Sequence, residues 1–410
     1  MSYKFANICV DISHEKVDRP FQYKIPPHLQ DALKPGMQVM IPFGKGNKTI
    51  RGFILELTDL SEYPEERCKE IIDVAGTGIP AEGRMIELAA WMKKNYGSTL
   101  ISSLKTVLPV KDKVRQIEQK DILLAATADE YQEALRTAKE KHHVAKVRLL
   151  EAFADADCLG YEFVTGKLNV SAQTIKALEK QNVIRIEKRT EYRNPIKIKA
   201  DRLQKAVLNP EQQKIADAFS KDYNEGIRKV YLLRGVTGSG KTEVYMEMID
   251  TVLSKGRQVI VLIPEIALTY QTVLRFYKRF GDCVSVIHSK LSKGERYDQF
   301  ERAKKGQIKI MIGPRSALFA PFPDLGLIVI DEEHENSYKS DSMPKYHARE
   351  VAEHIASVAE ASVVLGSATP SVTSFYRAMN GEYGYFYLEN RYNSRKLPTV
   401  YTVDLREELK

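Results

Sequence analysis

The chain has 410 residues, a formal charge of +8, a pI near 9.0 and a mean hydropathy of −0.34. This length allows about two to four domains with a large core, and the basic balance is compatible with a polyanionic partner, although 62 lysines and arginines could equally form an ordinary solvated surface. Nowhere do eighteen apolar residues follow one another, which excludes a membrane-spanning helix of the usual kind.

Cysteine usage and the first residues bear on the compartment. Cys9, Cys68, Cys158 and Cys283 are far apart and include no C-x-x-C pair, which argues against a metal cluster and favours reduced thiols. The amino terminus has no basic stretch followed by an apolar run, so we expect no signal peptide. These features favour a cytoplasmic protein.

Residues 1–112 are predicted to form a β-rich, barrel-like domain. Short apolar or alternating runs, separated by turn signals such as K-P-G and G-K-G-N, favour strands. The expected strands are residues 6–12, 21–25, 37–43, 50–57 and 69–76. A helix over residues 85–97 is expected to close the domain.

Residues 113–200 have a different pattern. Residues 113–120 are polar and charged, as in a linker. Helical spacing over 145–153 and 170–181, with Ser171 as a cap, is followed by an alternating strand over 182–189. This order predicts a winged-helix domain that binds DNA. Small helical units with a terminal hairpin also serve as plain spacers, so both interpretations stay open.

Residues 201–392 alternate between buried strands and helices, which predicts an α/β lobe with a parallel sheet. The expected strands are residues 230–234, 258–264, 308–313, 325–331 and 362–366. A helix is expected over 243–253. Residues 393–410 are expected to be a connecting segment with a strand inside it.

The string GVTGSGKT, residues 235–242, fits the phosphate-loop pattern at every specified position. Between a strand and a helix, backbone N–H groups and the helix N-terminus converge on an anion. Lys241 would reach the β and γ phosphates and the Thr242 hydroxyl would bind Mg²⁺. The expected nucleotide-binding residues of the loop are Gly235, Thr237, Gly238, Ser239, Gly240, Lys241 and Thr242.

The string DEEH begins at Asp331, after a buried strand. Asp331 would meet the metal's coordination sphere, and Glu332 would orient or deprotonate the attacking water. A lone Asp-Glu pair after a strand is usually a solvated turn. Because a phosphate loop lies in the same domain, we interpret this Asp-Glu pair as catalytic and not as a solvated turn.

Several strings together resemble one family. The strings are GVTGSGKTEVY, PEIALT, HSKLSKGER, GPRSALFAPF, DEEHENSYK and GSATPS. DEEH and SAT resemble the superfamily-two helicases, and the full set is similar to the replication-restart helicases of the primosome. That resemblance implies a RecA-like motor lobe in an ATP-dependent enzyme that unwinds DNA 3′ to 5′ and restarts stalled forks.

The resemblance also implies roles for individual residues. Gln212 would contact adenine, and His334, Ser367 and Thr369 would couple hydrolysis to DNA movement. Arg315, within GPRSALFAPF, would join the DNA-binding or coupling residues. Tyr338 and Tyr346 would stack on unpaired bases, with a plain surface loop as the alternative interpretation.

The amino-terminal domain resembles the family's domain for the leading-strand 3′ end. The matching pocket positions are Phe21, Gly44 and Lys69, while Gln22 replaces the family's aspartate and lacks its charge. From the residues alone, Phe21 would be assigned to the core. The winged helix would contact duplex arms mainly through phosphates.

Family members continue with a second lobe that carries an arginine finger and zinc-binding cysteines, so zinc is expected only there. We expect this chain to bind ATP with Mg²⁺ weakly, and to bind forked and single-stranded DNA with a 3′ end, without rapid turnover or unwinding. Primosome loader proteins and single-strand-binding protein are the expected partners, and no membrane is involved. Alternatives are a double-strand DNA translocase and a DNA-binding scaffold switched by ATP.

Overall fold

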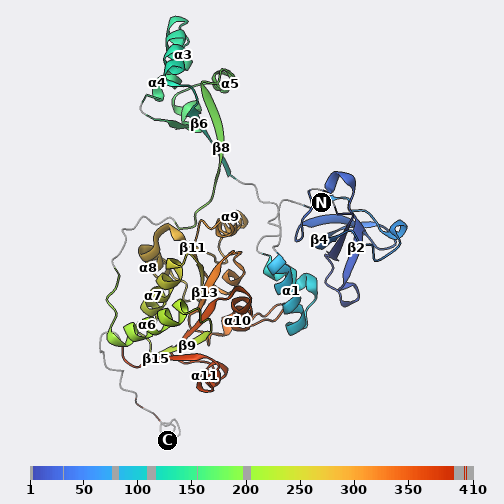
Figure 1. Cartoon of the computed structure of the whole chain (residues 1–410), viewed down its shortest axis with the longest axis vertical. Coiled ribbons are helices and arrows are strands. Elements are labelled where there is room, and N and C mark those ends of the chain that lie inside the picture. Colours follow the sequence, from blue (N-terminus) through green and yellow to red (C-terminus); the bar gives the residue numbers. More distant parts are fainter. Residues whose placement is uncertain are drawn as a thin grey trace. The chain divides into compact units, whose positions relative to one another are not determined.

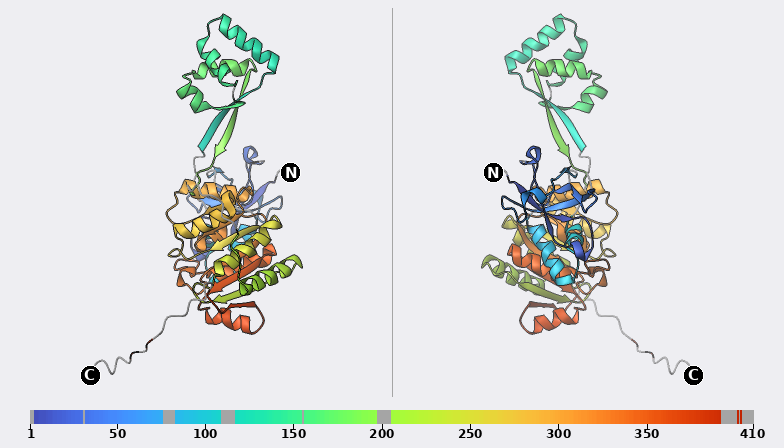
Figure 2. Two further views of the ribbon diagram at one scale, coloured as in Figure 1. Left: turned by 90° about the vertical axis from the view of Figure 1, so that its left-hand side faces the viewer. Right: turned by 90° about the vertical axis from the view of Figure 1, so that its right-hand side faces the viewer.

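The computed structural model describes residues 3–30, 32–75, 83–108, 117–154, 156–196, 205–391, 401 and 403 (Figures 1 and 2). The chain divides into two compact units. One comprises Met1–Val114 together with Asn194–Lys410, and the other is Arg115–Arg193. Among the described residues, no helix has the length and apolar character needed to cross a membrane.

The first residues form an antiparallel sheet of five strands, in the order β2-β1-β4-β3-β5. The strands are β1 (Phe5–Val10), β2 (Pro20–Lys24), β3 (Gln38–Phe43), β4 (Lys48–Thr58) and β5 (Asp73–Val74). Ile8, Val39 and Ile54 are fully buried in the core of this β unit, residues 3–75. The β-rich prediction is confirmed, although β5 is shorter than expected.

Two helices, α1 (Gly83–Tyr96) and α2 (Leu100–Val107), follow the β unit. Thr99 caps α2 by accepting a hydrogen bond from the Ser102 backbone N–H. One continuous apolar core includes Cys9 and Phe53 of the β unit, side chains of both helices, and side chains of the α/β lobe. The helices therefore join the two parts through packed side chains. Only α1 was predicted.

The second unit contains helices and a three-stranded antiparallel sheet in the order β7-β6-β8. Its elements are β6 (Ile117–Leu124), α3 (Ala128–Glu140), α4 (Val144–Ala152), β7 (Cys158–Gly160), α5 (Ala172–Lys180) and β8 (Ile184–Glu191). Ser171 caps α5 as predicted. The linker prediction was wrong over 117–120, because these residues pair with β8, while 113–116 lie outside the described residues. The winged-helix assignment stays a prediction.

The α/β lobe, residues 205–391, has a seven-stranded parallel sheet in the order β11-β12-β10-β13-β14-β9-β15. The strands are β9 (Val230–Gly235), β10 (Gln258–Leu262), β11 (Val284–Val286), β12 (Ile310–Gly313), β13 (Leu325–Ile330), β14 (Ser362–Ser367) and β15 (Gly384–Leu388). The predicted parallel sheet is confirmed. The short strand β11 and the edge strand β15 were not predicted.

Helices cover both faces of this sheet (Figure 1). They are α6 (Pro210–Asn224), α7 (Lys241–Ser254), α8 (Tyr270–Phe280), α9 (Lys293–Lys304), α10 (Ala348–Ala359) and α11 (Val372–Met379). Side chains of α6, α7 and α8 share a core with Val259 and Val261, whereas those of α9, α10 and α11 share one with Ile260 and Leu262. Successive side chains of a strand point to opposite faces, so the central strands are apolar throughout. The predicted connecting segment, 393–410, lies outside the described residues except for Tyr401 and Val403.

Candidate functional site

The phosphate loop, residues 236–240, connects the end of β9 to the start of α7. Gly238 and Gly240 have φ angles of +81° and +82°, which an L side chain rarely adopts. The left-handed Gly240 is the N-cap of α7, which runs for 14 residues. The predicted order of strand, glycine loop and helix is confirmed, and it directs backbone N–H groups toward a bound anion.

Lys241 lies over this loop and is nearly buried, with 7% of its surface exposed. Its Nζ donates to the Gly235 carbonyl at 3.0 Å and lies 3.7 Å from Glu332 Oε1. The Ser239 hydroxyl is buried and has no hydrogen-bond partner among the residues that the structure describes. A cation and an unpartnered hydroxyl at a helix N-terminus fit the phosphate chain of a nucleotide.

The Gln212 side chain is hydrogen bonded to the phosphate loop. Its Nε2 donates to the Ser239 carbonyl at 2.9 Å, and its Oε1 accepts from the Asn209 backbone N–H at 3.0 Å. The Asn209 Oδ1 accepts a hydrogen bond from the Gln212 backbone N–H at 2.9 Å, so the pair forms a capping box at the start of α6. The side chain is fully buried. Protein partners occupy both ends of the amide in this structure, and the contact of Gln212 with adenine stays a prediction.

Asp331 and Glu332 follow β13 directly, as predicted. Asp331 Oδ1 accepts from the Tyr245 hydroxyl at 3.1 Å. Burial raises the pKa of Asp331, the Glu332 charge raises it further, and Lys241 opposes both. A buried carboxylate beside a second carboxylate is a site that a divalent cation would stabilise. Thr242, the other predicted Mg²⁺ ligand, occupies the second position of α7.

His334, Ser367 and Thr369 come together beside Glu332. The His334 Nδ1 and the Ser367 hydroxyl are hydrogen bonded at 2.7 Å, and the Thr369 N–H donates to the same hydroxyl at 3.0 Å. His334 Nδ1 lies 3.7 Å from Glu332 Oε2. The structure therefore connects the DEEH string to the SAT string, which begins at Ser367, the last residue of β14.

Arg315 lies away from that cluster. Its Nη1 donates to the Ser337 carbonyl at 3.1 Å and also to the Lys339 carbonyl. The guanidinium therefore holds the backbone that follows DEEH. Its predicted role in DNA binding or coupling stays a prediction.

Tyr338 and Tyr346 are not exposed to a DNA strand in this structure, and their stacking on unpaired bases stays a prediction. Both rings are buried, with 1% and 3% of their surfaces exposed. The Tyr338 hydroxyl donates to the Asp331 carbonyl at 2.7 Å, and the Tyr346 ring packs edge-on against Phe319. Burial raises the pKa of Tyr346 to about 12. The alternative of a plain surface loop does not fit, because both rings are buried.

Glu333 and Arg349 form a buried cluster that the sequence reasoning did not single out. Glu333 accepts from the Ser371 N–H at 2.6 Å and from the Ser374 hydroxyl at 3.0 Å, and its Oε2 lies 3.3 Å from Arg349 Nη1. Arg349 also donates to both serine hydroxyls. In the sequence, the sign of this cluster is limited to the additional acidic residue, Glu333, in the DEEH string.

In the β unit, three of the four predicted pocket residues are connected. Phe21 packs edge-on against Phe43 at 5.2 Å, and Gly44 follows Phe43. Lys69 Nζ donates to the Gly44 carbonyl at 2.7 Å. The Arg19 guanidinium lies 5.2 Å from the Phe21 ring. A guanidinium against a half-buried aromatic ring, with a lysine on the Gly44 backbone, is compatible with a nucleotide terminus.

Gln22 does not join this group. It is buried, its Nε2 donates to the Leu60 carbonyl at 3.0 Å, and its Oε1 accepts from the Glu62 N–H at 2.8 Å. Adjacent residues of a strand face opposite sides, so Gln22 secures the loop after β4 instead. In this orientation Gln22 does not line the predicted pocket with Phe21, Gly44 and Lys69.

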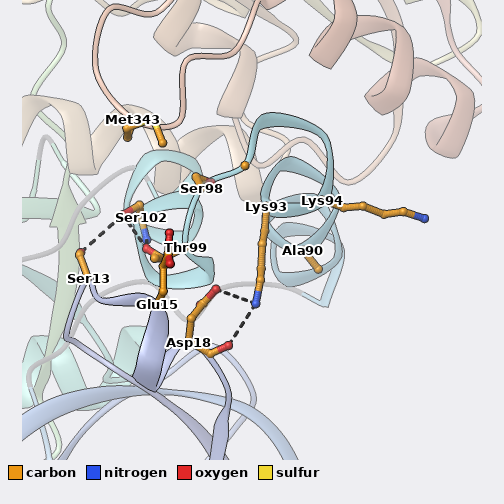
Figure 3. Close-up of a pocket in the computed structure, with 11 residues that line it drawn as sticks. Ser13, Glu15, Asp18, Ala90, Lys93, Lys94, Ser98, Thr99, Ser102 and Met343 are labelled. Carbon is orange, nitrogen blue, oxygen red and sulfur yellow. Dashed lines mark hydrogen bonds and ion pairs between the residues drawn. The ribbon is translucent and has the colours of Figure 1, made fainter.

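A cavity of about 760 Å³ lies where the β unit meets α1 and α2 (Figure 3). Asp18 bridges the three elements, because its Oδ2 lies 2.7 Å from Lys93 Nζ of α1 and its Oδ1 accepts from the Leu100 N–H of α2 at 2.7 Å. Met343 of the α/β lobe also lines the cavity. The β unit is therefore attached to α1 and α2 by charged contacts as well as by the apolar core.

Helix α1 is attached in turn to α10. The Tyr96 hydroxyl donates to Glu350 Oε2 at 2.7 Å, and the Trp91 ring is stacked on His354 with 4.1 Å between ring centroids. Burial and the Glu350 carboxylate raise the pKa of Tyr96 far above its usual range. These contacts place α1 between the β unit and the α/β lobe.

Comparison with protein families identifies two segments. Residues 7–109 match the PriA 3′DNA-binding domain (3′BD) family. Residues 205–372 match the family described as type III restriction enzyme, res subunit. The first segment covers the β unit with α1 and α2, and the second covers the phosphate loop, DEEH and SAT.

Among curated proteins, the chain is similar to the replication restart protein PriA of Bacillus subtilis, with 35% identity over 473 positions covering 99% of this chain and 58% of the relative. A PriA protein of Synechocystis is 44% identical over 58% of this chain and 29% of the relative. The chain thus spans little more than half the length of the Bacillus relative.

Comparison with solved structures gives partial matches. RecG bound to a three-way DNA junction matches at 21% identity over 45% of this chain and 24% of that chain, with a TM-score of 0.35. The Pyrococcus furiosus Hef helicase domain matches at 19% identity over 43% of this chain and 37% of that chain, with a TM-score of 0.31.

Proposed function

We propose that this chain is the fork-binding and ATP-binding part of a DNA helicase, because residues 7–109 match the PriA 3′DNA-binding domain family and 99% of the chain is similar to a replication restart protein PriA. A protein of the relatives' length would use ATP to unwind DNA in the 3′ to 5′ direction and restart replication at stalled forks in the cytoplasm. The chain would bind nucleotide and DNA.

The observation that carries this proposal is the position of Lys241. Its ammonium group bridges the phosphate loop and Glu332, with contacts of 3.0 and 3.7 Å. Glu332 and His334 approach each other, and His334 is bonded to Ser367. These contacts would couple the nucleotide site to His334 and Ser367. DNA binding that moves these two residues would then change the affinity for nucleotide.

The residues of this site divide the work of ATP hydrolysis. Lys241, the Ser239 hydroxyl and the loop N–H groups would hold the phosphates, while Thr242 and Asp331 would hold Mg²⁺. Magnesium, when bound, would neutralise charge on the β and γ phosphates. The Glu332 carboxylate would orient a water molecule and accept its proton. Tyr245 keeps the Asp331 carboxylate in place by a hydrogen bond.

The β unit would take the 3′ end of DNA. Phe21 would stack on the terminal base, and Lys69 with the Gly44 backbone would contact the terminal sugar and phosphate. Arg19, which the sequence reasoning did not name, lies against Phe21 and would add to the local positive charge. The second unit would contact duplex phosphates. Primosome loader proteins and single-strand-binding protein are the partners that we propose for the complete protein.

Two binding measurements test the proposal. Calorimetry with the magnesium complex of AMP-PNP should show binding that Lys241→Ala weakens at least tenfold, whereas Lys69→Ala leaves it unchanged. Fluorescence anisotropy with a fork that has a free 3′ end should show the reverse pattern. Equal nucleotide affinity of the wild type and Lys241→Ala would contradict the nucleotide site, and no preference for a free over a blocked 3′ end would contradict the DNA site.

A further inference from the structure

Glu332 has an unusual backbone conformation. Its φ angle is +47°, in the left-handed region that a residue other than glycine adopts at a cost in free energy. Such a conformation persists when neighbouring residues fix it. The Asp331 N–H donates to the Leu262 carbonyl and the Glu333 N–H donates to the Gly366 carbonyl, both at 2.9 Å. Backbone contacts therefore hold the residues on both sides of Glu332.

The Glu333 side chain supplies a further restraint. Only 1% of the residue is exposed, and its carboxylate has partners on α10 and at the start of α11. A buried carboxylate with several donors has little freedom to rotate or withdraw. The side chain next to Glu332 is thus anchored to two helices.

Arg349 completes the anchor from α10. It lies on the first turn of that helix, and its Nη1 contacts Glu333 together with the hydroxyls of Ser371 and Ser374. The segment leading into α10 is also fixed, because Lys339 and His347 form an antiparallel bridge. A shift of α10 would therefore move the partners of Glu333.

The same helix contacts α1. Glu350, the neighbour of Arg349, accepts from Tyr96, and His354 is stacked on Trp91. Asp18 of the β unit holds Lys93 of α1. Contiguous contacts therefore run from the β unit through α1 and α10 to the residue beside Glu332.

We propose that Arg349 is a positioning residue that fixes Glu333, holds Glu332 in its left-handed conformation and links nucleotide binding to DNA binding in the β unit. The inference rests on the proposed function, since it assumes that nucleotide binds beside Glu332 and DNA binds the β unit. DNA that shifts α1 and α10 would change the affinity for nucleotide, and nucleotide would change the affinity for DNA by the same factor.

A buried ion pair could instead serve stability alone, so the test needs a matched control. Arg377 of α11 provides one, because its Nη1 lies 3.0 Å from Glu353 Oε2 of α10 and bonds to the Tyr383 hydroxyl. Arg377→Met removes an arginine–glutamate contact to the same helix without touching Glu333. Arg349→Met removes the proposed link.

The experiment measures the dissociation constant of the magnesium complex of AMP-PNP with and without a single-stranded oligonucleotide that has a free 3′ end. In the wild type the oligonucleotide should change this constant by about fivefold or more. Arg349→Met should reduce the change to less than about twofold, Arg349→Lys should restore part of it, and Arg377→Met should keep the wild-type value. If Arg349→Met does not fold, Ser374→Ala, which removes one shared hydroxyl, should show an intermediate value.

Trp91 provides a second measurement, because it is the only tryptophan in the chain and stacks on α10. Nucleotide should change its emission in the wild type and not in Arg349→Met. A wild-type coupling factor near one, or a wild-type factor retained in Arg349→Met or Ser374→Ala, would overturn the proposal. Loss of nucleotide binding in every protein, or equal binding by Lys241→Ala, would instead contradict the proposed function.

Discussion

Gly366 lies in β14, beside the proposed nucleotide site, and a side chain at this position should reduce stability. A Cβ at this position would lie 1.5 Å from Tyr245 Oη and 2.6 Å from its Cζ. The tyrosine cannot move aside easily, since it is 1% exposed and donates to Asp331. Gly366→Ala must therefore displace Tyr245, β14 or both.

The expected loss of stability has two parts. Forcing an extra carbon into a packed core costs about 1–3 kcal/mol, and losing a hydrogen bond to a charged group adds about 1.5–3 kcal/mol. The free energy of unfolding, from urea denaturation followed by circular dichroism, should fall by about 3–5 kcal/mol. Because Asp331 loses its donor, affinity for the magnesium complex of AMP-PNP should also fall by about tenfold or more, equivalent to about 1.4 kcal/mol.

Gly326→Ala is the matched control, at the opposite end of β13 from Asp331. Its Cβ would lie 2.6 Å from Tyr223 Oη and 2.7 Å from Val252 Cγ1. This variant should lose comparable stability and keep nucleotide affinity. A Gly366→Ala protein as stable as the wild type, or one that loses stability without losing nucleotide affinity, would refute the reasoning.

Three further predictions follow from the side chains around the two sites. Because burial raises the pKa of Asp331 in the folded state, the folded protein holds that proton more tightly than the unfolded chain and loses stability as the pH rises through the raised pKa. Asp331→Asn should therefore have a larger free energy of unfolding than the wild type at pH 8. Urea denaturation at pH 4 should show a smaller stability difference between the two proteins. An equal or larger difference at pH 4 would contradict the raised pKa. Gln22→Ala removes the side-chain partners of the Leu60 carbonyl and the Glu62 N–H. Thermal denaturation should show a decrease of about 1–3 kcal/mol in the free energy of unfolding, with unchanged affinity for a DNA 3′ end. Weaker 3′-end binding by the folded variant would show that Gln22 is part of the pocket. Tyr346→Leu, which removes the aromatic ring and keeps an apolar side chain, should leave the affinity of the folded variant for single-stranded DNA within about twofold of the wild type by anisotropy. A loss of about 1–3 kcal/mol, as expected when a base loses its stacking partner, would show that the ring is accessible to DNA.

Local chemistry explains which parts of the fold were predictable. The phosphate loop was placed correctly because Gly238 and Gly240 must adopt left-handed conformations between a strand and a helix. The central strands were recognised from their continuous apolar runs. Helix α3 was missed although Thr127 and Glu130 form a capping box that the sequence displays, because its polar composition resembles a linker. Strands β6 and β15 depend on distant pairing partners, which no local pattern reveals.

The candidate site shows the same division. Lys241, Asp331 and Glu332 could be located because their motifs follow β9 and β13, which lie on either side of β14 in the parallel sheet. Tyr338 and Tyr346 could not, because the same tyrosines suit a DNA-facing loop or a core, and only tertiary packing decides between them. The capping role of Gln212 could be predicted from the spacing of N-P-E-Q, whereas the family resemblance implies an adenine contact for the same side chain. Arg349 has no sequence signal, because its partners are distant in the chain.

A crystal structure of the chain with the magnesium complex of AMP-PNP would test the central claim most directly. We predict that the triphosphate lies in the loop 236–240, that Lys241 Nζ leaves Glu332 for the phosphates, and that magnesium lies beside Thr242 and Asp331. A nucleotide bound elsewhere, with Lys241 still paired with Glu332, would contradict the account.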